Sequence, residues 1–209
     1  HYMRFERGVT TVKMRDTPCE SETGTTIRFH ADPEIFETTV YEYDVLEKRL
    51  REQAFLNAGL KITLRDERDD EPVEEVMHYE GGIRQFVEYL QNKRGLEALS
   101  EDVIYVSGMD GDSFAEVALQ YNDSYNDLIL SFANNIHTAD GGTHETGFKN
   151  ALTKVINEYG KKFGLLKDGQ KLLGDDVREG LTAIVSVKLT ECEFEGQTKG
   201  RLGNPAVKP

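Results

Sequence analysis

The stretch LTAIVSVKL at residues 181–189 decides how the second half of this chain is predicted to fold. Threonine, isoleucine and valine recur along it, and this composition is typical of a β-strand. A short acidic helix start precedes it at residues 175–179. The stretch is therefore the last strand of a sheet, and the elements before it indicate which sheet.

Working backward, residues 143–162 carry an apolar stripe at helical spacing, and residues 83–93 carry a second one. Between these helices we expect three strands at 103–106, 114–120 and 127–133, with Asp110-Gly111 as the turn of a hairpin. We expect the three consecutive strands to form an antiparallel meander. The order helix, three strands, helix, strand predicts an α+β or split βαβ fold with helices on one face of a mostly antiparallel sheet.

The first 80 residues read differently. Residues 2–7 and 9–14 alternate well enough to form a hairpin or a pair of sheet strands, and residues 25–29 predict a short strand. Residues 44–58 predict a helix that Asp44 caps and that Gly59 ends in a left-handed conformation. Strands at 60–64 and 73–79 follow as a second hairpin. The double glycine Gly81-Gly82 then marks a candidate domain boundary.

Composition excludes several classes of protein. Of 209 residues, 25 are Lys or Arg and 38 are Asp or Glu, so the net charge of −13 argues against a surface that coats nucleic acid or anionic membrane throughout. No apolar run approaches the roughly 18 residues of a membrane span, and the first residues lack the apolar core of a signal peptide. Cys19 and Cys192 are too few for a disulfide framework or a four-ligand zinc site. We expect a cytoplasmic protein that does not bind membranes.

Three segments could carry chemistry. Residues 140–143 (DGGT) enter a helix and could bind an anion, or they could be a glycine turn followed by a threonine cap. Residues 143–167 hold five lysines and two glutamates, a net +3 that suits either a polyanion contact or a solvated helix face. Lys199, in a loop punctuated by glycines, could reach a terminal phosphate or could lie in an ordinary surface loop.

The sequence shows no self-contained catalytic constellation. The five histidines lack the spacing of metal ligands, and no serine or cysteine has the sequence setting of a nucleophile. As a set, however, the motifs resemble the ATPase region of the bacterial DNA gyrase B proteins and their topoisomerase IV counterparts. The resemblance rests on GTTIRF (24–29), RLRE (49–52), FLN (55–57), HYEGG (78–82), EVALQYN (116–122), NNI (134–136), GGTH (141–144), REGL (178–181) and QTK (197–199).

The resemblance implies two domains. Residues 1–80 are similar to the C-terminal part of a GHKL-type ATPase sandwich, and residues 81–209 are similar to the transducer domain that follows it, with a left-handed βαβ unit. It also implies an ATP-hydrolysing type II topoisomerase that couples ATP binding and hydrolysis to dimer closure, DNA strand passage and supercoiling. The implied partners are double-stranded DNA, a second copy of the chain through ATP-dependent dimerisation, and a gyrase A-type subunit.

Four residues take roles from the resemblance. Thr25 matches a threonine that lines the adenine pocket, Gln197 and Lys199 match the loop that reaches the γ-phosphate, and Lys149 matches a basic residue facing a DNA-sized cavity. Lys199 is then the catalytic candidate, and ATP with Mg²⁺ is the implied cofactor. The family's general-base Glu, magnesium-binding Asn, adenine-reading Asp and glycine-rich lid have no match here. We therefore expect this chain alone to be inactive and to hold no metal ligand. The alternative is a non-enzymatic binding or scaffolding module that keeps the transducer fold without ATP sensing.

Overall fold

The structure is a computed structural model that describes residues 1–18 and 23–205, so Cys19 lies outside the described residues. The chain divides into two compact units, His1–Leu46 and Glu47–Pro209. In the first unit, β1 (Tyr2–Glu6) and β2 (Val9–Arg15) pair antiparallel. The predicted N-terminal hairpin is therefore confirmed.

The strand predicted at residues 25–29 is wrong. These residues have no regular secondary structure, and Ile27 and Phe29 are 83% and 71% exposed. A strand requires hydrogen bonds to a neighbouring strand. Within the described part of the chain, no strand pairs with this segment. The alternating sequence pattern favours a strand, but the segment does not form one without a neighbouring strand to pair with.

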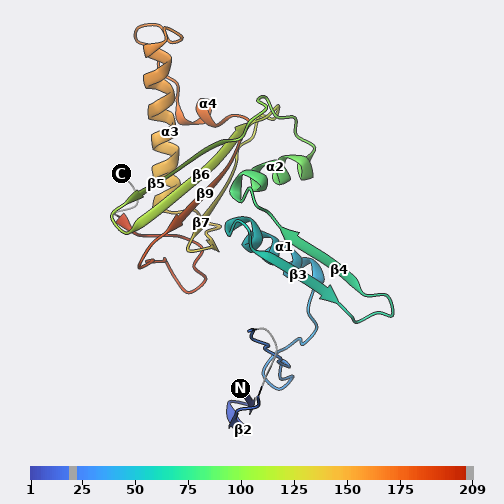
Figure 1. The fold of residues 1–209 in the computed structure, drawn as a ribbon. Helices are drawn as coiled ribbons and strands as arrows, with labels where there is room; N and C mark the ends of the chain where they lie inside the picture. The colour runs from blue at the N-terminus through green and yellow to red at the C-terminus, as the bar shows by residue number, and fades with distance from the viewer. Residues whose placement is uncertain (19–22, 206–209) are drawn as a thin grey trace. The chain divides into compact units, whose positions relative to one another are not determined.

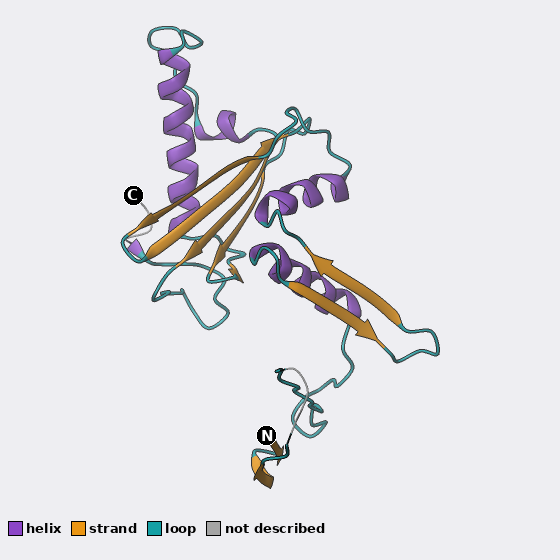
Figure 2. Cartoon of the chain, viewed as in Figure 1, coloured by secondary structure: helices purple, strands orange, loops and turns teal. Residues whose placement is uncertain are grey.

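The second unit contains most of the regular structure (Figures 1 and 2). Its helices are α1 (Tyr43–Leu56, which begins in the first unit), α2 (Ile83–Arg94), α3 (Thr143–Lys162) and α4 (Gly174–Arg178). Its strands are β3 (Lys61–Asp66), β4 (Val73–His78), β5 (Ile104–Asp110), β6 (Ser113–Tyr121), β7 (Leu128–Ala133), β8 (Ile136–His137) and β9 (Leu181–Lys188). Among the described residues, no helix combines the length and the apolar character that crossing a lipid bilayer requires.

The main sheet has the strand order β5-β6-β9-β7-β8. All neighbouring pairs are antiparallel except β7 and β9, which are parallel. The sheet is thus mostly antiparallel as predicted, but the predicted meander of three consecutive strands is wrong, because β9 lies between β6 and β7. The seven residues of β9 from Leu181 to Val187 are buried. The central position in the sheet removes the most apolar surface of this strand from water, so it is the position that stabilises β9 most.

Helices cover both faces of this sheet, so the prediction that they share one face is wrong. Along β9, Ile184 packs in a cluster with Phe86 and Val87 of α2, whereas Ala183 packs in a cluster with Phe148 of α3. Neighbouring residues of a strand point to opposite faces. A central strand that is apolar on both faces needs cover on both sides, and α2 and α3 provide it. The connection β7–α3–β9 is a βαβ unit, and its left-handedness stays a prediction.

Elements α1, β3 and β4 follow the predicted pattern. β3 and β4 form the expected antiparallel hairpin, and Gly59 has the left-handed φ of 81° that ends α1. Asp44 lies inside the first turn of α1 rather than before it. The division between compact units falls after Leu46, and the domain boundary at residues 80 and 81 stays a prediction.

Candidate functional site

The loop at residues 193–203, which we call the 193–203 loop, is a small hairpin with its own hydrogen bonds. At its base, the Gly203 amide donates to the Glu193 carbonyl over 2.7 Å, and the Glu195 amide donates to the Arg201 carbonyl over 2.9 Å. Leu202 pairs with the opposite arm at Phe194 and is completely buried. The base of the loop is therefore fixed to the body of the domain.

The tip of this loop carries the residues that the sequence singled out. The Lys199 amide donates to the Gly196 carbonyl over 3.3 Å, which closes a tight turn around the exposed Gln197. Lys199 is also exposed and has φ of 56°, an uncommon conformation for a residue with a side chain. Conformations of this kind concentrate at functional sites. The structure thus brings Gln197 and Lys199 together at an exposed tip.

The Lys199 ammonium lies beside the arms of its own loop. Its Nζ is 5.8 Å from the centre of the Phe194 ring, within reach of a cation–π contact. Burial raises the pKa of the Cys192 thiol, and the positive charge of Lys199 acts in the opposite direction. Lys199 has no carboxylate partner within the described residues, so its ammonium is available to bind an anion.

Residues 140–143, at the start of α3, bind the backbone of this loop. The Thr143 amide donates to the Leu202 carbonyl over 3.0 Å, and the Asp140 amide donates to the Gly200 carbonyl over 2.8 Å. Gly142 occupies the N-cap position, so the predicted threonine cap is wrong: Thr143 already lies inside the helix. The helix start binds the loop backbone where we considered an anion.

Glycine at position 142 is required by this contact. Gly142 has φ of 147°, and a Cβ built there would lie 2.5 Å from the Leu202 carbonyl oxygen. No larger residue permits the two backbones to approach so closely. The GG dipeptide is therefore the docking site for the base of the 193–203 loop.

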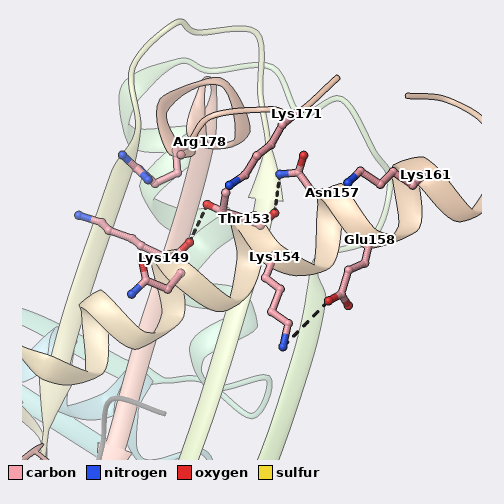
Figure 3. A pocket seen from close by; sticks show the side chains of 10 residues that line it. Lys149, Thr153, Lys154, Asn157, Glu158, Lys161, Lys171 and Arg178 are labelled. Atoms are coloured by element: carbon pink, nitrogen blue, oxygen red, sulfur yellow. Dashed lines mark hydrogen bonds and ion pairs between the residues drawn. The ribbon is translucent and has the colours of Figure 1, made fainter. Parts of the chain in front are cut away.

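Lys149 lies on α3, one turn beyond Glu145, whose carboxylate Oε1 is 2.6 Å from the lysine Nζ. Lys149 is one of the residues that line a cavity of about 390 Å³ between α3 and the segment that leads into α4 (Figure 3). The lining of this cavity contains five cationic side chains and one carboxylate, and we call it the cationic cavity. Its lining residues are Lys149, Asn150, Thr153, Lys154, Asn157, Glu158, Lys161, Lys171, Gly174 and Arg178.

The cations of this cavity differ in how they are neutralised. Arg178 is held by Asp127 at 3.2 Å and by Asp175 at 2.5 Å, and only 18% of its side chain is exposed. Within the described part of the chain, Lys161 and Lys171 have no ion pair. An excess of positive charge around a concave surface favours an anionic partner. The polyanion contact and the solvated helix face both stay open as predictions for residues 143–167.

Thr25 is exposed and belongs to the first compact unit, whereas Gln197, Lys199 and Lys149 belong to the second. Sequence reasoning missed a buried polar group under the docking site, formed by Ser131, Thr138 and His144 with Glu145. The one local signal was a histidine and a glutamate beside a double glycine at a helix start.

A sequence profile of the DNA gyrase B family matches residues 82–209, which is more than half of the chain. The chain belongs to the DNA gyrase B family. The gyrase B profile includes the 193–203 loop, α3 and the cationic cavity, and it leaves Thr25 outside.

Individual gyrase B relatives agree with this assignment. The chain is 56% identical over 206 residues to the DNA gyrase B protein of Clostridium acetobutylicum, covering 98% of this chain and 32% of that protein. The solved 43K ATPase domain of Thermus thermophilus gyrase B, in complex with an aminocoumarin, has a TM-score of 0.73 at 42% identity and covers 85% of this chain and 47% of that chain. The DNA gyrase B protein of Myxococcus xanthus has a TM-score of 0.79 at 26% identity, covering 99% of this chain and 59% of that chain. The chain therefore spans 32% to 59% of the length of these relatives.

Proposed function

We propose that this chain is part of the ATPase region of an ATP-dependent type II DNA topoisomerase of the gyrase B type. In the complete enzyme it couples ATP binding and hydrolysis to dimer closure and to DNA strand passage and supercoiling. The single observation that carries this proposal is the 193–203 loop, which presents Lys199 at an exposed tip with φ of 56° while its base is fixed to α3. Family membership supports the proposal.

We assign residues 1–80 to the C-terminal part of the GHKL ATPase domain and residues 81–209 to the transducer. The gyrase B profile begins at residue 82, close to this division. Cytoplasmic localisation, a partner copy of the chain and a gyrase A-type subunit belong to the same proposal. They follow from the gyrase B assignment rather than from a feature of this fold.

Lys199 would contact the terminal phosphate of ATP, with Gln197 beside it. A lysine ammonium is a compact point charge that suits a phosphate oxygen, and it would stabilise charge that develops on the transferred phosphoryl group. Because ADP lacks this phosphate, the contact differs between the two nucleotides. Only such a differential contact allows a ligand to shift a conformational equilibrium.

We propose ATP as the cofactor, with Thr25 at its adenine and Mg²⁺ bound with the nucleotide in the complete enzyme. Among the described residues, no group of three or more His, Cys, Asp or Glu side chains is placed to hold a metal ion. The roles proposed for Gln197 and Lys199 involve the phosphate of the nucleotide alone.

Double-stranded DNA is the proposed partner of Lys149 and of the cationic cavity. Phosphate groups of a DNA backbone would replace the solvent around Lys161 and Lys171, the cations without a carboxylate partner in the described chain. Binding of this kind releases counterions and weakens steeply with salt. The positive charge of α3 makes such a contact compatible with the overall net charge of −13.

The test of the nucleotide role is Lys199→Ala in the complete enzyme that carries this sequence. We expect turnover of ATP to fall by roughly 10²-fold or more, as for other preorganised charge stabilisers, while ADP affinity stays within about twofold. Lys167→Ala is the control, because this exposed lysine follows the opposite end of α3. Normal turnover in Lys199→Ala, or equal loss of ATP and ADP affinity, would reject the role and favour a scaffolding module.

The test of the DNA role is Lys149→Ala in the same enzyme. DNA-stimulated ATPase activity should fall more than basal activity, and the slope of DNA affinity against salt concentration should become shallower. An equal loss of basal and stimulated activity would indicate a folding defect and would contradict a DNA contact at Lys149.

A further inference from the structure

Beneath the docking site for the 193–203 loop, four polar side chains form one continuous hydrogen-bonded chain. His144 Nε2 is 3.1 Å from Thr138 Oγ1, which is 2.7 Å from Ser131 Oγ. Ser131 Oγ donates to Glu145 Oε2 over 2.8 Å. His144, Thr138 and Ser131 are at most 3% exposed, so water does not compete for these bonds. We call these four residues the buried polar chain.

Two donors of this chain have defined acceptors. The Glu145 carboxylate only accepts hydrogen bonds, so the Ser131 hydroxyl is the donor in the bond between them. The Thr138 hydroxyl donates to the Ser131 backbone carbonyl over 2.8 Å, and its oxygen lies within hydrogen-bond distance of both Ser131 Oγ and His144 Nε2. His144 Nδ1 is a buried nitrogen without a partner among the described residues.

The carboxylate at the end of this chain meets two other features. Its other oxygen, Oε1, accepts from Lys149 Nζ over 2.6 Å. Its Oε2 lies only 3.0 Å from where a Cβ on Gly141 would stand, so the carboxylate rests against the backbone of the docking site. The Gly141 carbonyl in turn accepts from the Leu202 amide of the loop over 3.2 Å. Glu145 thus contacts the DNA-facing lysine on one side and the loop's docking site on the other.

We propose that Glu145 is a positioning residue that couples the occupancy of Lys149 to the placement of the 193–203 loop. This inference rests on the proposed function, because it assigns DNA to Lys149 and phosphate sensing to Lys199. When a DNA phosphate draws Lys149 away, Glu145 keeps the Ser131 donor and loses its strongest one. Its carboxylate then holds an uncompensated charge beside Gly141, whose carbonyl accepts from the Leu202 amide, so the change reaches the docking site of the loop.

Hydrogen exchange on this chain tests the link without any enzymatic activity. Glu145→Gln keeps the shape of the side chain and removes its charge. We expect the amides of Thr143 and Leu202 to lose protection by about tenfold, the change that follows from losing one hydrogen bond to a charged group. Glu158→Gln is the matched control, since Glu158 forms the other pair at this spacing on α3, at 4.0 Å from Lys154. Unchanged protection in Glu145→Gln would overturn the proposal.

Lys149→Ala should reduce protection of the same amides, and the double variant Glu145→Gln/Lys149→Ala should be no worse than the more affected single variant. Additive losses would mean that the two residues act separately, which would also overturn the proposal. In a protein whose fold is merely weakened, protection would instead fall throughout β9.

Turnover measurements on the complete enzyme test the consequence. In Glu145→Gln, the ratio of DNA-stimulated to basal ATPase activity should fall toward one. Glu88→Gln, an exposed carboxylate on α2, should leave this ratio unchanged. A retained stimulation ratio would overturn the coupling. If Lys199→Ala shows that the loop does not sense phosphate, the exchange result still stands by itself, so the two failures are distinguishable.

Discussion

β9 and the 193–203 loop are close neighbours in the sequence and are stabilised in opposite ways. β9 is hydrogen-bonded to strands on both sides and buried on both faces. The loop is bound to the body of the domain through Gly200, Leu202 and the docking site, whereas Gln197 and Lys199 at its tip are exposed. One segment therefore contributes mainly to stability, and the other can contribute to function with little effect on stability.

This difference means that substitutions in the two segments should separate stability from activity. The Lys199 variant should lose turnover and remain folded, because an exposed side chain contributes within about 0.5 kcal/mol to stability. Variants in β9 should do the reverse. The following predictions run from the largest expected change in the free energy of unfolding to the smallest.

Ile184→Ala should lower the free energy of unfolding by about 4 kcal/mol, as removal of a fully buried isoleucine usually does. Ile184 is completely buried in the cluster that includes Phe86, Val87 and Phe132. Urea unfolding followed by circular dichroism measures the change. A loss below about 1 kcal/mol would mean that β9 is not the centre of the stable core.

The buried polar chain should make stability depend on pH. Burial lowers the pKa of His144 to about 4, from an ordinary value of 6.5. Between pH 6.5 and 4, the unfolded chain therefore binds a proton at His144 that the folded chain does not bind. The contribution of neutral His144 to the free energy of unfolding is fully present above pH 6.5 and is lost as the pH drops toward 4. The full effect is at most about 3 kcal/mol.

His144→Gln is the matched variant, because its amide can still donate to Thr138 and does not titrate. Subtracting its stability curve from that of the original protein removes the contribution of other groups, including His137, whose pKa burial also lowers. Curves that run parallel between pH 6.5 and 4 would show that His144 is protonated as easily as in the unfolded chain, contrary to its burial.

These examples also show how far sequence reasoning reaches. The β3–β4 and β5–β6 hairpins were predictable because alternation and turn residues are local signals. The position of β9 was not, because its pairing with β6 and β7 joins residues more than 50 positions apart. Burial on both faces of β9 also required helices on both faces, a consequence that the helix and strand patterns alone do not contain.

The candidate site divides in the same way. Resemblance identified Gln197 and Lys199 from sequence motifs alone, and the structure places them at one loop tip. Their anchoring by Gly142 could not be predicted, since the glycine's partner Leu202 is 60 residues away. All four residues of the buried polar chain lie within residues 131–145, but they belong to β7, the segment before α3 and α3 itself, so their contact depends on how these elements fold back on one another.

Gly142→Ala should detach the base of the 193–203 loop while leaving β9 intact. Its φ of 147° disfavours a side chain by about 1–3 kcal/mol, and the Leu202 backbone must also move. Hydrogen exchange should show faster exchange at Thr143 and Leu202 and normal protection along β9. Gly164→Ala is the control, because that glycine also has a positive φ but its Cβ would meet no atom within 4 Å. Equal effects of the two variants would show that strain, rather than the close approach, determines the result.

The smallest expected effect compares two lysines on α3. Lys154 pairs with Glu158 at 4.0 Å with both side chains more than 60% exposed, so Lys154→Ala should change the free energy of unfolding by no more than about 0.5 kcal/mol. Lys149 pairs with Glu145 at 2.6 Å with 33% and 18% exposure, and its removal should destabilise the protein by about 1 kcal/mol. Salt should separate them further, because 1 M NaCl screens the exposed pair and leaves most of the shielded one. Equal losses at low salt, or losses that vanish together at high salt, would mean that Glu145 is as solvated as Glu158, and the contrast between a fixed helix start and a solvated helix end would fail.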